Sequence, residues 1–136
     1  MIVIDTSVLS EAFRHRRGIQ PTRSAEELVR LIRDGESLAV PGVVLQEFLA
    51  GLRDEALFLK LAGLLRPLRL LLATHENHVA AARISNSCRA AGIAAGAVDC
   101  LIAAQALGRD HQLFSSDRDF ERIAEVCELQ LYLPMN

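Results

Sequence analysis

The sequence predicts a three-layer α/β fold with a mainly parallel central sheet of about five strands. Two observations carry this prediction: short, fully apolar runs recur along the chain, and segments with helical patterning separate them. Brief apolar runs suit strands that are buried on both faces of a sheet. Alternation of strands with helices is typical of parallel sheets that helices cover on both sides.

Five apolar runs are the candidate strands, and they are spread over the whole chain. They cover residues 2–4, 37–40, 68–73, 112–114 and 129–133. No repeat, low-complexity segment or Ser/Gly-rich linker divides the chain, so we expect a single domain over residues 1–136. Ligands of such folds usually bind beyond the carboxyl ends of the strands, where the strand order reverses.

The expected helices have ends that can be read from residue type. Ser24 and Glu27 have the spacing of a capping box, in which each side chain accepts from the other residue's backbone N–H. Pro41 is tolerated in a first turn and opens a helix over 42–52. Further helices are predicted to begin at Thr6, to run from the cap Thr74 to Gly92, to span 97–107 before Gly108, and to span 120–124.

Composition narrows the class of protein. The net charge is −2, and the three cysteines are widely spaced, which argues against a disulfide framework or a zinc site and favours a reducing cytosol. We expect a cytoplasmic protein, since the most apolar stretch, 58–73, is too short and too charged to cross a membrane. Lys60 is the only lysine among fifteen basic residues, and arginine suits phosphate recognition, although codon bias explains the same excess.

Four carboxylates occupy positions where a carboxylate is costly or sits beside the predicted core. Asp5 follows the first strand, Asp99 lies in the first turn of its helix, and Asp117 follows the fourth strand. Glu47 shares a helix face with Val43 and Val44, beside the apolar stripe. Each has an ordinary structural explanation, as a helix cap, a first-turn acid favoured by the helix dipole, or a boundary residue.

The set as a whole is harder to explain by local structure. The two strand-end positions, Asp5 and Asp117, lie on one edge of a parallel sheet, and converging carboxylates repel by roughly 4 kcal/mol per pair at about 4 Å and an effective dielectric constant of about 20. A cation would compensate this repulsion. Oxygen ligands without a nearby His or Cys select a hard ion, Mg²⁺ or Mn²⁺.

These motifs together resemble a PIN domain, and more narrowly a VapC-type toxin of a type II toxin–antitoxin pair. The matching stretches are 2–9, 44–52, 99–106 and 113–120, in family order and with family spacing. The resemblance implies that Asp5, Glu47, Asp99 and Asp117 form an acidic cluster that binds Mg²⁺ or Mn²⁺. It also implies supporting roles for the hydroxyls of Thr6 and Ser115 and for the carboxylate of Asp119.

The same resemblance implies metal-assisted hydrolysis of single-stranded or loop RNA by an endoribonuclease, leaving a 5′-phosphate and a 3′-hydroxyl. It further implies a homodimer and a hetero-oligomer with a VapB-like antitoxin that neutralises the toxin. We expect phosphate contacts from the arginines Arg14, Arg16, Arg17 and Arg118. The apolar helical positions Leu57, Leu61, Leu64 and Leu65 are a candidate partner surface, with burial in the monomer core as the alternative.

Three other functions compete with this one. A PIN nuclease that processes RNA without a toxin role would carry the same four carboxylates. A non-catalytic interaction module on the same fold would be favoured by loss of an acidic position, and none is lost. A phosphoacceptor receiver domain is disfavoured, since it needs an Asp after the third strand, where Ala73 and Thr74 stand, and a Lys after the fifth.

Overall fold

The computed structural model describes residues 1–14, 18–108 and 111–134, which form five strands and seven helices. Two of the predicted strands, 68–73 and 129–133, are shorter in the structure, and the strand predicted over 37–40 lies one residue later, at Leu38–Pro41. In chain order the elements are β1 (Ile2–Ile4), α1 (Thr6–Phe13), α2 (Arg23–Arg33), β2 (Leu38–Pro41), α3 (Gly42–Ala50), α4 (Glu55–Leu65), β3 (Arg69–Leu71), α5 (His75–Ala90), α6 (Ala97–Leu107), β4 (Gln112–Phe114), α7 (Asp119–Ile123) and β5 (Gln130–Leu131).

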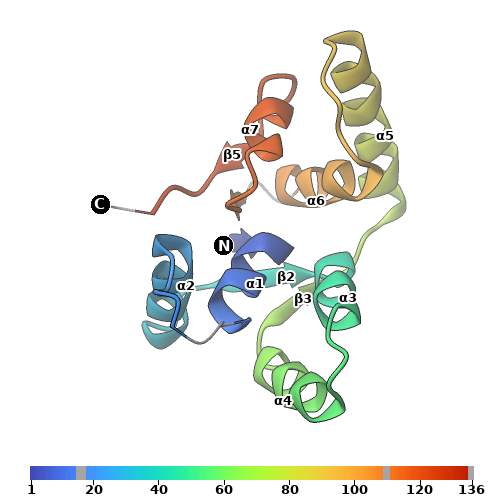
Figure 1. Cartoon of the computed structure of the whole chain (residues 1–136). Coiled ribbons are helices and arrows are strands. Elements are labelled where there is room, and N and C mark those ends of the chain that lie inside the picture. The colour runs from blue at the N-terminus through green and yellow to red at the C-terminus, as the bar shows by residue number, and fades with distance from the viewer. Residues whose placement is uncertain (15–17, 109–110, 135–136) are drawn as a thin grey trace.

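The strands form one sheet in the order β3-β2-β1-β4-β5, and every neighbouring pair is parallel. The predicted α/β class and parallel sheet are therefore confirmed. Because crossovers between parallel strands are right-handed, the reversal of direction after β3 places α1–α4 on one face and α5–α7 on the other. In Figure 1, α5, α6 and α7 gather in the upper part of the molecule and α1–α4 in the lower part.

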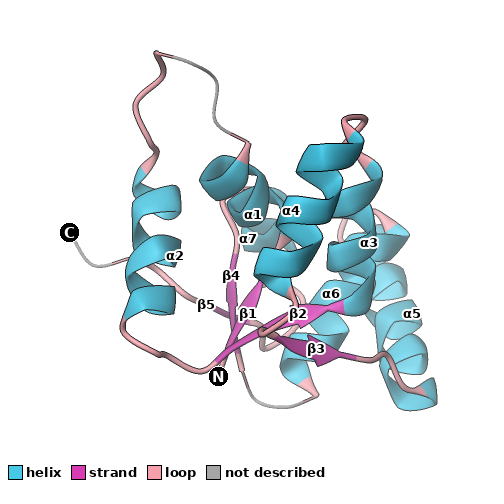
Figure 2. Ribbon diagram, turned by 90° about the horizontal axis from the view of Figure 1, so that it is seen from below, coloured by secondary structure: helices cyan, strands magenta, loops and turns pink. Residues whose placement is uncertain are grey.

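The strand order reverses between β1 and β4, which lie side by side at the centre of the sheet. The chain first moves outward from β1 through β2 to β3, then returns through α5 and α6 to β4 on the other side of β1. Figure 2 shows β1 and β4 in the middle of the sheet, with β5 on one side of them and β2 and β3 on the other. The carboxyl ends of β1 and β4 thus form the edge where this kind of fold usually binds its ligand.

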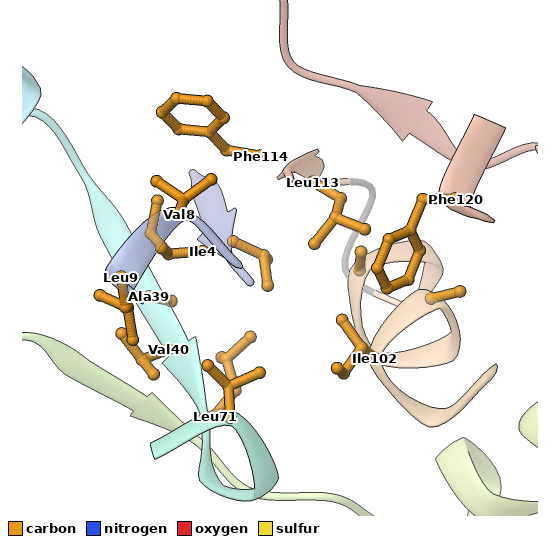
Figure 3. Packing of buried hydrophobic residues seen from close by; sticks show 14 of the residues in the cluster. Ile4, Val8, Leu9, Ala39, Val40, Leu71, Ile102, Leu113, Phe114 and Phe120 are labelled. Carbon is orange, nitrogen blue, oxygen red and sulfur yellow. The ribbon is translucent and has the colours of Figure 1, made fainter. Parts of the chain in front are cut away.

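The hydrophobic core lies on both faces of the sheet. Consecutive residues of β4 point to opposite faces, as in any strand. In Figure 3, Leu113 lies on the side of Ile102 and Phe120, whereas Phe114 lies on the side of Val8. All five of these side chains are at most 1% exposed. The segments that follow β1 and β4 therefore start from a close-packed part of the core, which holds their first residues in place.

Helix ends confirm part of the sequence prediction. Thr74 and Asn77 form a reciprocal capping box at the start of α5, Gly92 follows its end with a left-handed φ of +75°, and Gly108 ends α6. The predicted capping box at Ser24 is wrong. Thr22 caps α2 instead, since its backbone is extended and its Oγ1 accepts from the Ala25 N–H at 3.1 Å, which places Ser24 already within the helix.

Two further helical predictions are corrected in detail. Helix α3 ends at Ala50, earlier than the predicted residue 52, and α7 spans Asp119–Ile123 where 120–124 was expected. The leucines of α4 divide between the two roles considered for them. Leu61 and Leu65 are buried in the monomer and Leu57 is half-buried, whereas Leu64 is 53% exposed and remains available to a partner. Within the described residues, no helix combines the length and apolarity that crossing a membrane requires.

Candidate metal centre

Five acidic side chains meet at the carboxyl edge of the two central strands. Asp99, Asp117 and Asp119 each offer a carboxylate oxygen, and these three oxygens lie within 4.8 Å of one another. Asp5 and Glu47 are close enough to act electrostatically on the carboxyl of Asp99. Residues that are up to 114 positions apart in the sequence thus form one cluster, as the position of the strand ends predicts.

Asp5 stands at the centre of this edge and is only 4% exposed. Its backbone is extended, and its side chain caps α1 by accepting from the Ser7 N–H at 3.4 Å. The same oxygen, Oδ2, accepts from the hydroxyl of Ser7 at 2.8 Å and from the hydroxyl of Ser115 at 2.7 Å. Asp5 is therefore both a helix cap and a member of the acidic cluster, so the two explanations considered for it are compatible.

Glu47 extends from α3 toward the first turn of α1. Its Oε1 accepts a hydrogen bond from the Thr6 hydroxyl at 3.1 Å. The side chain is exposed, whereas its neighbours Val44 and Phe48 are fully buried. Glu47 thus lies beside the apolar stripe, and the carboxylate faces solvent at the margin of the cluster.

The pKa of Asp99 reflects the repulsion between the carboxylates of the cluster. Burial raises its pKa, and the nearby carboxylates of Asp5, Asp117, Glu47 and Asp119 raise it further, to about 6. Both effects disfavour the charged form. A divalent cation would reverse them, because it attracts the carboxylates that now repel one another.

The ligand atoms available here fit Mg²⁺ or Mn²⁺. The cluster offers carboxylate and hydroxyl oxygens, which hard divalent cations prefer. The ion pairs found among the described residues join Arg30 to Glu27 and to Asp34 on α2, and neither of them involves the cluster. Cys100 follows Asp99 but is buried, and burial raises the pKa of its thiol.

The loop between β4 and α7 is held by its own polar groups. The Asp117 N–H donates to the Ser115 hydroxyl at 3.0 Å, and the Asp119 N–H donates to Oδ1 of Asp117 at 2.9 Å. Both carboxylates remain exposed. Asp119, expected only as a variable supporting residue, thus lies directly beside Asp99 and Asp117.

The arginines expected to contact phosphate have different surroundings. Arg14 donates through Nη2 to the Phe48 carbonyl at 2.6 Å and stacks over the Phe48 ring, 5.1 Å from its centroid. This guanidinium therefore joins α1 to the end of α3. Arg118 is exposed at the start of α7, and Arg16 and Arg17 lie outside the described residues.

Sequence reasoning missed Ser7. Its hydroxyl contacts Asp5 and accepts from the Ser116 N–H at 3.1 Å, so it links α1 to the loop after β4. A local signal existed, because a serine two positions after a capping Asp lies within reach of that carboxylate. The contact with residue 116 had no such signal, since it depends on the pairing of β1 with β4.

Comparison with known proteins agrees with this architecture. The PIN domain model matches residues 2–126. Ribonuclease VapC11 of Mycobacterium tuberculosis is 33% identical over 133 residues, covering 96% of each protein.

Solved structures resemble the chain over nearly its whole length. FitAcB from Neisseria gonorrhoeae superposes with a TM-score of 0.76 at 23% identity, covering 98% of both chains. VapC20 of Mycobacterium tuberculosis, described as a sarcin–ricin loop cleaving toxin, superposes with a TM-score of 0.70 at 18% identity, covering 96% of this chain and 99% of that one. The expected family is thereby confirmed: this chain is a PIN-domain protein and belongs with the VapC ribonucleases.

Proposed function

We propose that this chain is a cytoplasmic endoribonuclease toxin that uses Mg²⁺ or Mn²⁺ to hydrolyse phosphodiester bonds in RNA. Asp5, Glu47, Asp99 and Asp117 would hold the cation, with Asp119 beside them. The observation that carries the proposal is the convergence of carboxylates beyond β1 and β4, which raises the pKa of Asp99 to about 6. The family supports the ribonuclease activity, since the relatives that match over the full chain are ribonucleases.

The bound cation would lower the pKa of a water molecule and stabilise negative charge on the phosphate. The chain's own residues supply the rest of the chemistry. Asp5 and Asp99 are held by packed elements and would fix the cation's position. The exposed carboxylates of Asp117 and Asp119 can accept the proton that the attacking water loses. In-line attack would leave a 5′-phosphate and a 3′-hydroxyl.

Two protein partners belong to the proposal. Structural relatives were solved as FitAB and VapBC assemblies, some bound to DNA, and one is described as a toxin–antitoxin complex. We infer that a VapB-like antitoxin silences this chain and that the toxin forms homodimers within a larger complex. A basic antitoxin side chain that enters the acidic cluster would be stabilised by charge-assisted hydrogen bonds.

The test uses purified protein, freed of antitoxin, on structured RNAs with Mg²⁺ or Mn²⁺. Asp5→Asn and Asp99→Asn remove one charge each, and Glu128→Gln removes an exposed charge in the segment just before β5 as a matched control. We expect cleavage by the wild type and the control, and none by the two cluster variants or with EDTA. Cleavage that survives in both cluster variants would reject this site.

The non-toxin RNA-processing enzyme and the binding module are distinguished by the same assay and one more. Toxicity on expression, relieved by the gene product encoded next to it, favours the toxin over a processing enzyme. Metal binding without cleavage of any RNA pool would favour the interaction module.

A further inference from the structure

We propose that Ser7 is a positioning residue that, together with Ser115, turns Asp5 into a one-oxygen ligand for the cation and attaches the metal-binding loop to β1. The proposal rests on the proposed function, because it assigns Asp5 to a metal site. It concerns hydrogen bonds within this chain, and its test does not depend on RNA cleavage.

The direction of each hydrogen bond follows from its donor. Backbone N–H groups can only donate, so the Ser116 N–H donates to the Ser7 hydroxyl at 3.1 Å and the Asp117 N–H donates to the Ser115 hydroxyl at 3.0 Å. Each hydroxyl has one proton left to give. Both give it to Oδ2 of Asp5, at 2.8 Å from Ser7 and 2.7 Å from Ser115.

The two hydroxyl oxygens also lie 3.2 Å apart, where either atom could be the donor. With both protons directed to Asp5, this short contact is a consequence of their shared acceptor. The two hydroxyls therefore fix one oxygen of a carboxylate that is only 4% exposed.

The other carboxylate oxygen has a different environment. Oδ2 accepts from two hydroxyls and, at 3.4 Å, from the Ser7 N–H, which uses its lone pairs fully. Among the described residues, Oδ1 accepts no hydrogen bond, and the charge of Asp5 acts on the nearby carboxyl of Asp99. The geometry therefore leaves Oδ1 as the oxygen that binds the cation.

Ser7, unlike Ser115, links α1 to the loop after β4. Ser115 belongs to the same loop as Asp117 and Asp119, whereas Ser7 lies on α1, 109 positions away from the N–H of Ser116 that it accepts. Its hydroxyl thus couples the start of α1 to the backbone of the loop that bears both exposed carboxylates. Removing it leaves Asp5 with one hydroxyl donor and leaves the Ser116 N–H without this acceptor.

The decisive experiment measures Mn²⁺ affinity by electron paramagnetic resonance of the unbound ion, on the full chain. Ser7→Ala should weaken Mn²⁺ binding by about tenfold or more, as loss of a group that orients a metal ligand typically does. Ser7→Thr, which keeps the hydroxyl, should restore binding to within about threefold of wild type. Ser10→Ala, one turn along the same helix, is the matched control and should bind as the wild type does.

The outcomes separate the positioning role from the enzyme's activity. Wild-type Mn²⁺ affinity in a folded Ser7→Ala protein would overturn the proposal, and so would equal weakening in Ser7→Ala and Ser10→Ala. If Ser7→Ala fails to fold, Ser115→Ala takes its place, and unchanged affinity there overturns the proposal as well. Weakened Mn²⁺ binding in Ser7→Ala, in a protein whose wild type cleaves no RNA, would support the positioning role and favour the interaction module over the ribonuclease.

Discussion

Asp99→Asn is expected to stabilise the protein when no metal is bound, although it removes a proposed metal ligand. The folded state raises the pKa of Asp99 from 3.8 to about 6, so the charged carboxylate is less favourable in the folded protein than in the unfolded chain. At about 1.36 kcal/mol per pKa unit, this shift corresponds to roughly 3 kcal/mol at most. Asp99 is half-buried, and solvent screening reduces the figure to about 1–2 kcal/mol.

The sign of this effect depends on pH. A raised folded-state pKa means that the stability is fully present below the unfolded pKa, near pH 4, and is lost as the pH rises through about 6. At about pH 7.5 the metal-free wild type carries the whole penalty, and the asparagine variant carries none. The gap between them should therefore be about 1–2 kcal/mol at that pH and should close toward pH 4.

The assay is urea unfolding followed by circular dichroism, in EDTA, at several values between about pH 4 and pH 8. Adding Mg²⁺ should reverse the order, because a cation at about 100 times its Kd stabilises only the protein that binds it, by about 2.7 kcal/mol. Glu128→Gln, an exposed charge in the segment just before β5, is the control. A metal-free Asp99→Asn protein that is less stable than wild type at about pH 7.5, or a gap that does not change with pH, would refute the reasoning.

Three further predictions concern contacts outside the cluster. Tyr132→Phe removes the hydroxyl that donates to the buried carboxylate of Glu27 at 2.8 Å, and should lower the free energy of unfolding by about 1–2 kcal/mol in urea titrations. Gly51→Ala places a Cβ against the guanidinium of Arg14 and should cost about 1 kcal/mol, a cost that disappears in an Arg14→Ala background when the double-mutant cycle is measured. Arg118→Gln should weaken RNA binding and reduce its salt dependence by about one phosphate contact; an unchanged slope in filter binding would exclude that contact.

Part of this structure could be predicted from residue type, because it depends on interactions between residues close together in the sequence. The buried strand 2–4, the cap at Thr74 and the glycine after α5 follow from apolar runs, a side-chain acceptor and a left-handed turn, all of which act within a few residues. The wrong prediction of a cap at Ser24 also arose from local interactions. Thr22 and Ser24, two positions apart, can each cap a helix, and the extended backbone at Thr22 makes that residue the cap of α2.

Only part of the acidic cluster could be predicted from the positions of its residues in the sequence. Asp5, Asp99 and Asp117 stand at strand ends and helix starts, and the parallel order of strands brings such positions to one edge. The assignment of Glu47 to the cluster depended on the resemblance to a family motif, because a glutamate at the edge of an apolar helix face is common. The role of each carboxylate as a metal ligand stays a prediction, which the cluster variants and Mn²⁺ binding test.

By itself, the sequence determined the α/β class, the parallel sheet and the candidate acids, since these depend on hydrophobic pattern and local propensity. Only the tertiary structure decided that Ser7 and Ser115 share one oxygen of Asp5, that Arg14 packs on Phe48, and that Asp119 joins Asp99. Apart from the bond between Ser7 and Asp5, which spans two positions, these contacts join residues between 20 and 110 positions apart. Their geometry depends on how β1 and β4 pair and how the helices pack, and no local pattern encodes such distances.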